Sequence, residues 1–152
     1  MKGLRGSVLL VALALLGGCT DDGGEKGQNG GADGGTTASS DEYRATISRT
    51  TDGVVHVRAG DMASAAFGQG FASFEDHGCD LADQLLKVNG QRARWFGPGE
   101  NNANIDSDFA WKAIDIVGRA SKDWTEADGE PRELVEGFAA GWNAALDDLG
   151  LG

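Results

Sequence analysis

Apolar and polar side chains alternate along residues 43–49, as expected for a strand with one buried face. Thr51, Asp52 and Gly53 follow in an order that is typical of a turn, because glycine accepts the positive φ angle that many turns need. The valine-rich residues 54–58 have the β-branched character of a second strand. The pattern therefore predicts a β-hairpin at the start of the folded part of the chain.

Helical spacing replaces this alternation after Asp61, which is suited to cap a helix that begins at Met62. Apolar and small residues recur at steps of three and four as far as Gly90, which predicts a long helix with one buried face. Gly68 and Gly70 weaken the helix but allow another backbone to approach closely. The predicted apolar face consists of Ala63, Ala66, Phe67, Gly70, Phe71, Phe74, Leu81, Leu85 and Val88.

The rest of the chain predicts a loop and two more helices. Residues 98–107 are polar and predict a loop, while residues 109–117 predict a short helix. Residues 125–128 resemble a capping box ahead of a final helix, which Gly150 closes. The apolar stripe of that helix consists of Leu134, Val135, Phe138, Ala139, Trp142, Ala145, Leu146 and Leu149.

These elements predict the α+β fold class, with an N-terminal β-hairpin followed mostly by helices. The predicted folded part, residues 43–152, is long enough for one small domain. We expect the stripe of the last helix, and the face that includes Phe67, Phe71 and Phe74, to pack partly on segments outside this chain. That arrangement would leave apolar surface exposed.

The first 18 residues have the features of an export signal. Lys2 and Arg5 precede an apolar run at residues 8–16, which is too short to span a bilayer as a helix. Cys19 follows two glycines in the arrangement of a bacterial lipobox, where the peptide is cut before a cysteine that becomes acylated. We therefore expect residues 1–18 to be a lipoprotein signal peptide and Cys19 to carry the lipid. The alternative is an ordinary signal peptide with an unrelated cysteine after it.

Residues 19–42 are rich in Gly, Asp, Ser and Thr and contain no aromatic side chain. Such a composition buries too little apolar surface to offset chain entropy, and it predicts a disordered tether between lipid and folded domain. Thr20 in place of Asp after the cysteine favours the outer membrane. The expected location is thus the bacterial cell envelope, lipid-anchored and facing the periplasm.

The chain is acidic, with 24 Asp and Glu against 13 Lys and Arg and a formal net charge of −11. Loss of Lys2 and Arg5 with the signal peptide makes the mature chain more acidic still. Such a surface repels nucleic acid and anionic membranes. We therefore expect no nucleic-acid partner, and contact with the membrane through the lipid anchor alone.

No arrangement of polar residues in the sequence predicts a catalytic or metal centre by spacing. Glu75, Asp76 and His77 are consecutive, so on a helix they point in different directions and cannot close on one ion. Gly68-x-Gly70 lacks the third glycine of a nucleotide-binding loop, because position 73 is serine. No metal or cofactor site is therefore expected.

The remaining polar candidates have structural explanations. His56 lies between valines in a predicted strand and is expected to be a structural hydrogen-bonding residue. Asp106 and Asp108 precede a predicted helix and are expected to cap it. Cys79 is either a buried thiol that acts as a small apolar residue or one half of a disulfide whose partner is encoded beyond residue 152.

Five short motifs, in order and with similar spacing, resemble those of the penicillin acylase family. Residues 47–57 (ISRTTDGVVHV) resemble the family's opening motif, and residues 67–72 (FGQGFA) resemble its F/Y-G-x-G-Y-A motif. Residues 75–77 (EDH) correspond to its E-D-R-type site, and residues 90–97 (GQRARWFG) to its G-x-x-A-x-x-F-G motif. Residues 137–143 (GFAAGWN) resemble G-Y-A-x-G-x-N. Each motif is weak alone, but together they identify the family.

The resemblance implies an αββα N-terminal-nucleophile hydrolase, made as a precursor that cuts itself into an α chain and a β chain. The N-terminal Ser of the β chain would attack the amide with its own α-amine as base, and β-chain groups would form the oxyanion hole. Residues 43–152 correspond to the first part of the α chain, so no catalytic residue is expected in this chain. The expected partners are a β chain encoded downstream and an acyl-amide substrate such as a penicillin, an acyl-homoserine lactone or a lipopeptide.

The motif around residues 90–97 and Cys79 make the chain most similar to the branch that cleaves acyl-homoserine lactones and lipopeptides. Val55 replaces the family's usual Pro, and His77 replaces its usual Arg or Asn, which is expected to alter a salt bridge. The resemblance allows a structural calcium in the complete enzyme, but its ligands are not identifiable in this sequence, and no cofactor is expected. Two interpretations stay open: the N-terminal part of a lipoprotein acylase, inactive by itself, or a stand-alone lipoprotein whose acylase-derived domain only binds.

Overall fold

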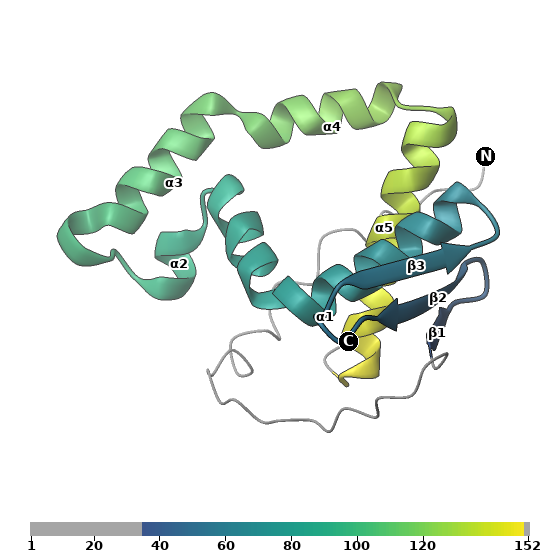
Figure 1. Cartoon of the computed structure of the whole chain (residues 1–152). Helices are drawn as coiled ribbons and strands as arrows, with labels where there is room; N and C mark the ends of the chain where they lie inside the picture. Colours follow the sequence, from purple (N-terminus) through teal and green to yellow (C-terminus); the bar gives the residue numbers. More distant parts are fainter. Residues whose placement is uncertain (1–34, 151–152) are drawn as a thin grey trace.

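The computed structural model describes residues 35–150. Three strands come first: β1 (Thr36–Ser39), β2 (Arg44–Arg49) and β3 (Val55–Ala59). The helices that follow are α1 (Met62–Val88), α2 (Arg92–Phe96), the 3-10 helix η2 (Glu100–Asn102), α3 (Ala103–Ile114), α4 (Ile116–Glu126) and α5 (Gly129–Asp148). Figure 1 shows the sheet, the first half of α1 and α5 lying together, while α2, α3 and α4 form an arch from the end of α1 to the start of α5.

The predicted hairpin is present. β2 pairs antiparallel with β3, and Ile47 lies opposite Val57. Gly53 in the connecting turn has φ 79°, and its N–H donates to the carbonyl oxygen of Thr50 at 2.9 Å. Because the register is fixed by this turn, Ala45 and Ile47 on β2 are directed to the buried face of the sheet.

A third strand extends the sheet beyond the predicted hairpin. β1 pairs antiparallel with β2, and Ala38 opposite Ala45 is buried. The prediction of a disordered tether over residues 19–42 is therefore wrong for residues 36–39, whereas residues 1–34 lie outside the described part of the chain. Two threonines and one alanine bury little apolar surface on their own, so this strand depends on pairing with β2. The composition of the segment therefore does not predict a strand.

The start of α1 follows the prediction. Asp61 caps the helix, since its Oδ1 accepts a hydrogen bond from the Ser64 N–H at 2.7 Å and its Oδ2 one from the Ser64 hydroxyl at 3.0 Å. The backbone hydrogen bond from Ser64 holds the pKa of the Asp61 carboxyl below its usual value. Downstream, α1 bends at His77, whose φ of −139° and ψ of 22° are not helical.

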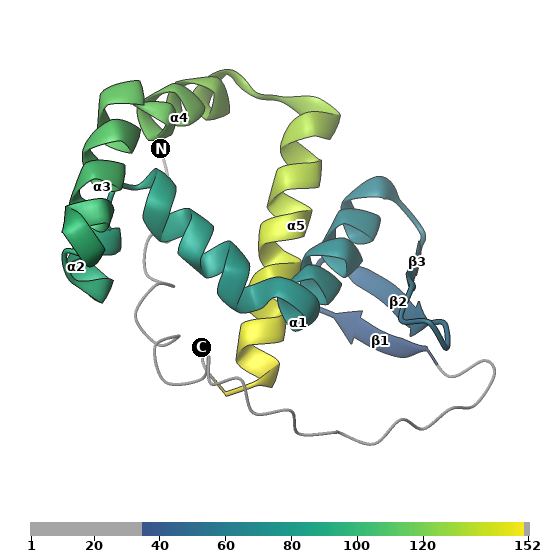
Figure 2. The same cartoon turned by 60° about the vertical axis from the view of Figure 1, so that its left-hand side comes forward.

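Glycines allow the backbones of α1 and α5 to touch. A Cβ atom on Gly141 of α5 would overlap the carbonyl oxygen of Phe67 on α1, and one on Gly137 would overlap that of Ala63. In the reverse direction, a Cβ atom on Gly70 of α1 would overlap the carbonyl oxygen of Phe138. Figure 2 shows the two helices crossing at this point. The two helices are thus packed through small residues rather than through interlocked large side chains.

The other side of α1 faces the sheet through a further glycine. A Cβ atom on Gly68 would lie 2.6 Å from Val57 Cγ1 of β3 and 2.7 Å from Ala45 Cβ of β2. The first half of α1 therefore forms the middle layer between the sheet and α5. The prediction that Gly68 and Gly70 admit close neighbours is confirmed, and the two glycines serve opposite faces of the helix.

Aromatic side chains fill the space around this crossing. Phe67 is fully buried and its ring lies 5.7 Å from that of Tyr43, while Phe74 contacts Trp142 of α5 edge to face at 5.0 Å between ring centroids. Phe71 is also buried. The expectation that this phenylalanine face packs on segments outside the chain is therefore wrong, because α5 and the sheet cover it.

The arch departs from the predicted elements. The predicted loop at residues 98–107 is helical from Ala103 onward, after Asn101 and Asn102 take positive φ angles of 51° and 64°. The predicted helix at residues 109–117 is divided at Asp115, whose φ of 54° ends α3 and separates it from α4. Local propensity does not reveal such a break, because aspartate accepts this conformation less readily than glycine.

The junction between α4 and α5 also differs from the prediction. Thr125 lies within α4 and donates its hydroxyl hydrogen to the Lys122 carbonyl at 2.7 Å, so the predicted capping box at residues 125–128 is wrong. Instead, the guanidinium of Arg132 on α5 lies 4.4 Å from the ring centroid of Trp124 and donates to the carbonyls of Trp124 and Ala127.

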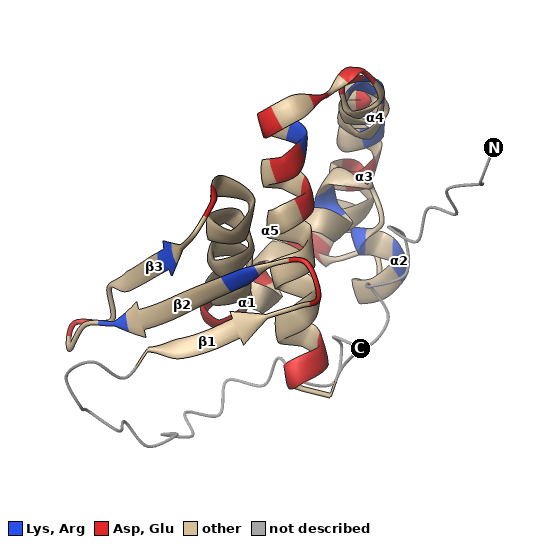
Figure 3. Ribbon diagram, turned by 90° about the vertical axis from the view of Figure 1, so that its right-hand side faces the viewer, with Lys and Arg blue, Asp and Glu red and all other residues tan. Residues whose placement is uncertain are grey.

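The observed architecture confirms the predicted α+β class: an antiparallel sheet is followed by helices. In Figure 3, acidic residues recur along α5, whereas basic residues are scattered over the sheet and the arch. None of the helices in residues 35–150 is both long and apolar enough to cross a membrane.

The glycine-mediated crossing generates a stability prediction. Gly141→Ala should lower the free energy of unfolding by roughly 3 kcal/mol or more, because its Cβ atom would meet the Phe67 carbonyl rather than a flexible side chain. Urea unfolding followed by circular dichroism measures the change. Gly60→Ala is the matched control, since open space surrounds that position, and it should stay within about 0.5 kcal/mol of the wild type. Equal stability of the two variants would contradict the close approach of α1 and α5.

Candidate functional site

An arginine at the end of β2 binds both acidic residues of the Glu75-Asp76-His77 motif. Arg49 Nη1 lies 2.9 Å from the Asp76 carboxylate, and Arg49 Nη2 lies 3.0 Å from Glu75 Oε2. All three side chains are partly exposed. The hydrogen bond with Asp76 is the main cause that raises the pKa of the Arg49 guanidinium further above its usual value. We call these three residues the Arg49 clamp.

The Arg49 clamp joins the sheet to α1 immediately before the bend of that helix. Two anchoring carboxylates on adjacent residues hold one guanidinium in a fixed orientation, which suits the planar fork of arginine better than a lysine would. His77, the third residue of the motif, is exposed and lies at the bend instead of in the ion pair. The clamp therefore sets where the first half of α1 ends relative to β2.

The clamp engages both carboxylates of the acidic motif. The two carboxylates are already bound to Arg49, and no group of three or more His, Cys, Asp or Glu side chains in residues 35–150 is arranged to hold a metal ion. What the sequence analysis missed is the role of Arg49, although it stands within the first recognised motif.

A second polar cluster holds the corner where α1, α2 and α3 meet. Arg92 Nε donates to Asp83 Oδ1 of α1 at 2.8 Å. The backbone N–H groups of Arg92 and Ala93 donate to the two carboxylate oxygens of Asp108, each at 2.9 Å. Asp108 is buried, so these charge-assisted bonds compensate the loss of water around its carboxylate.

Asp106 and Asp108 were predicted to cap the helix that follows them. Asp108 does cap a helix, but that helix is α2, which precedes it in the chain. Asp108 caps the N-terminus of α2 across a sequence separation of 15 and 16 residues, whereas Asp106 is exposed in the first turn of α3. Sequence spacing could not find this cap, since the donor helix precedes the aspartate and is five residues long.

Two other candidate residues differ from their predictions. His56 is exposed on β3 opposite Ser48, and its side chain makes no hydrogen bond within residues 35–150, so a structural hydrogen-bonding role is wrong. Cys79 is exposed on α1 and is not a free thiol, which excludes the alternative of a buried apolar cysteine. A disulfide partner encoded beyond residue 152 stays a prediction. Cys19, the predicted lipid site, lies outside the described residues.

The described interactions thus form a scaffold that joins the elements of the chain. The glycine crossing fixes α5 on α1, the Arg49 clamp fixes α1 on the sheet, and Asp108 fixes α2 on α3. Several residues of this scaffold lie within the five sequence motifs. Gly70 belongs to residues 67–72, Gly137 and Gly141 belong to residues 137–143, and Arg92 belongs to residues 90–97. The motifs therefore mark the positions that hold the elements together.

A solved structure shares the fold of this chain. A thermostable penicillin G acylase from Alcaligenes faecalis superposes with a TM-score of 0.65 and 22% sequence identity, over 76% of this chain and 56% of that chain. At this identity the match shows the fold. The chain thus has part of the fold of a penicillin acylase.

Sequence comparisons identify the family. Residues 44–151 match the model of the penicillin amidase family. The acyl-homoserine lactone acylase PvdQ of Pseudomonas fluorescens (strain Pf0-1) is 39% identical over 106 residues, 67% of this chain and 14% of that protein. Aculeacin-A acylase of Actinoplanes utahensis is 35% identical over 116 residues, 72% of this chain and 15% of that protein. The chain belongs to the penicillin amidase family, and it spans a small part of the length of these curated relatives.

The clamp generates a prediction of coupling. Arg49→Gln should lower the free energy of unfolding by about 0.5–1 kcal/mol, a modest amount because solvent screens the partly exposed pair. In an Asp76→Asn background the same change should cost less, since one of the two partners is already uncharged. Urea unfolding of the four proteins in the cycle measures the coupling.

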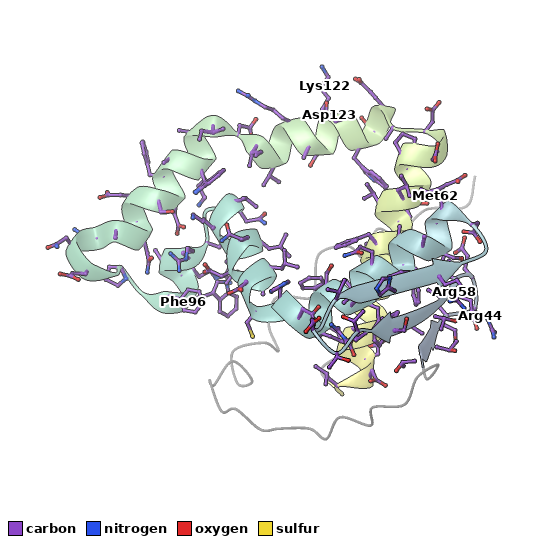
Figure 4. The ribbon with its side chains drawn as sticks, viewed as in Figure 1. Arg44, Arg58, Met62, Phe96, Lys122 and Asp123 are labelled. Atoms are coloured by element: carbon purple, nitrogen blue, oxygen red, sulfur yellow. The ribbon has the colours of Figure 1, made fainter. Side chains whose placement is uncertain are left out.

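Arg58→Gln is the matched control, because Arg58 is exposed on β3 and forms no salt bridge within residues 35–150 (Figure 4). It should leave the free energy of unfolding within about 0.5 kcal/mol of the wild type. A cost of Arg49→Gln that is the same with and without Asp76→Asn would refute the clamp.

Proposed function

We propose that this chain is the N-terminal portion of the α chain of an acylase that hydrolyses acyl amide bonds. The observation that carries the proposal is the 39% identity to an acyl-homoserine lactone acylase, which runs through the segment that carries the scaffold. We further propose acyl-homoserine lactones as the substrate class to test first, with penicillin-like and lipopeptide-like amides as alternatives. All of these share an amide between an acyl group and an amine.

In this proposal the chain contributes support and not chemistry. Amide hydrolysis by this family's proposed route needs an N-terminal Ser whose own amine acts as base, together with donors for the tetrahedral oxyanion. The described polar residues are instead bound to one another: Glu75 and Asp76 to Arg49, Asp108 to the start of α2. We therefore propose that the nucleophile and oxyanion hole belong to the β chain, and that the isolated chain is inactive.

A chimera tests the proposed function. Residues 44–151 of this chain replace the homologous segment of the Pseudomonas fluorescens acylase, and release of homoserine lactone from long-chain substrates is followed by chromatography. The chimera should hydrolyse the substrate and release homoserine lactone, whereas the purified 152-residue chain should show no acyl release above a buffer blank. A chimera with its β-chain N-terminal Ser changed to Ala is the control. Turnover by the isolated chain would overturn the assignment of the chemistry to the β chain.

We also propose that the chain is anchored in the cell envelope through a lipid on Cys19, facing the periplasm. The support is the apolar run that ends in Gly-Gly-Cys19. Cys19→Ser should move the protein from the membrane fraction to the soluble fraction and abolish labelling by radioactive palmitate. Cys79→Ser is the matched control and should leave both unchanged. Membrane association of Cys19→Ser equal to that of the wild type would exclude the anchor.

A further inference from the structure

The long helix α1 ends in an asparagine that is followed by a glycine. Asn89 is exposed and caps α1, and Gly90 leads into the corner where α1, α2 and α3 meet (Figure 2). Every other asparagine in residues 35–150 precedes a residue that has a side chain. A glycine leaves its own backbone nitrogen unshielded, because it has no Cβ atom. In a freely moving chain, this pair is therefore the place where backbone attack on an asparagine side chain is easiest.

The reaction open to this pair is deamidation. The Gly90 nitrogen attacks Asn89 Cγ and forms a C–N bond, while the side-chain amide nitrogen leaves as ammonia with the proton that the Gly90 nitrogen gives up. Water then opens the resulting cyclic imide at either of its carbonyl carbons. One opening gives aspartate, and the other gives isoaspartate, in which the main chain runs through the former side chain. Water is the only reagent consumed, and loss of ammonia makes the change permanent.

The folded end of α1 keeps the reacting groups apart. The Gly90 N–H donates to the Lys87 carbonyl oxygen at 3.0 Å, and Asn89 Nδ2 donates to the Leu85 carbonyl oxygen at 2.7 Å. Imide closure requires the Gly90 nitrogen to eclipse Asn89 Cβ about the Cα–C bond. The ψ angle of −4° at Asn89 instead makes it eclipse the Asn89 backbone nitrogen. The reaction therefore requires the end of α1 to open.

The products of the reaction do not fit the closed corner. A Cβ atom on Gly90 would lie 2.8 Å from the Asp108 carbonyl oxygen and 2.8 Å from side-chain atoms of Lys112, so the Gly90 backbone lies tightly against α3. The additional main-chain atom of isoaspartate would displace this backbone. Aspartate would place a carboxylate beside the Leu85 carbonyl that now accepts from the amide, at the negative end of the helix. Both products thus favour the open corner.

We propose that Asn89 is a site of spontaneous deamidation, which the closed corner suppresses and which, once it has happened, keeps the corner open. The proposal rests on the corner alone and is independent of the acylase function. Its effect falls on α2, because the backbone N–H groups of Arg92 and Ala93 are held by Asp108 across the same corner. An opening that lasts long enough for the imide to close is thereby made permanent.

The test compares deamidation at the Asn-Gly pairs of the 152-residue chain. Trypsin isolates Asn89 in residues 88–92 and Asn29 in residues 27–44. Asn29 lies outside the described residues, in the segment whose composition predicts a tether. Mass spectrometry after incubation at mildly alkaline pH follows the mass gain of each peptide. In native buffer, Asn89 should react about tenfold or more slowly than Asn29, and in urea the rates should agree within about threefold.

A pair of variants locates the protection at the corner. Asp108→Ala removes the acceptor that holds the start of α2, so it should raise the rate at Asn89 about fivefold or more without changing the rate at Asn29. Asp106→Ala is the matched control, because Asp106 is exposed in the first turn of α3. It should leave both rates unchanged.

A second measurement follows the consequence of the modification by hydrogen exchange. Asn89→Asp has the side chain of one product, whereas Asn89→Gln keeps an amide. Amides of α2 should exchange about tenfold faster in Asn89→Asp than in Asn89→Gln. Amides between Phe67 and Phe74 should exchange equally slowly in both variants and in Asp108→Ala, which shows that the packed part of each variant stays folded.

Contradictory results are defined for each step. Equal rates at Asn89 and Asn29 in native buffer would show that the corner gives no protection. Absence of reaction at Asn89 in urea would show that the pair is not a modification site. A rate at Asn89 that Asp108→Ala leaves unchanged would place the control of the reaction outside the corner. Equal exchange of α2 in Asn89→Asp and Asn89→Gln would show that the product fits the closed corner. Any of these results would overturn the proposal.

Discussion

The contact between the backbones of α1 and α5 is the constraint on which the rest of the structure depends. Gly70, Gly137 and Gly141 lack the Cβ atoms that would keep the helices apart. A Cβ atom at any of these positions would overlap a main-chain carbonyl on the opposite helix. Main-chain atoms cannot rotate aside as side chains do, so the crossing tolerates no larger residue at these positions. Once the two helices touch, Phe67, Phe74 and Trp142 are enclosed between them and the sheet.

Ion pairs and hydrogen bonds join the elements at the edges of this core. The Arg49 clamp joins the sheet to α1 before its bend, and Asp108 joins α3 to the start of α2 beyond it. α3 and α4 extend past these anchors with their apolar residues exposed. The molecule therefore divides into a packed part, which carries four of the five family motifs, and an arch with little internal support, in which α2 carries the fifth.

The sequence predicted the packed part well, because it is governed by local rules. Alternation revealed the hairpin, helical spacing revealed α1 and α5, and Asp61 caps α1 as expected. The arch was predicted poorly, since a positive φ at Asp115 and a cap supplied by Asp108 to a preceding helix depend on contacts that spacing does not encode. β1 was missed for a related reason: its short Thr-rich sequence becomes a strand through pairing with β2. The family motifs include Glu75 and Asp76, but they do not reveal that Arg49 pairs with both side chains.

Native-state hydrogen exchange of the isolated chain tests the central claim most directly, because it reports the local stability of each helix in one experiment. If the glycine crossing organises the fold, amides of α1 between Phe67 and Phe74 and of α5 between Gly141 and Leu146 exchange most slowly and with a common free energy. The amides of α4 exchange much faster. Protection in α4 equal to that in α1 and α5 would contradict the account, since it would place the organising contact outside the crossing.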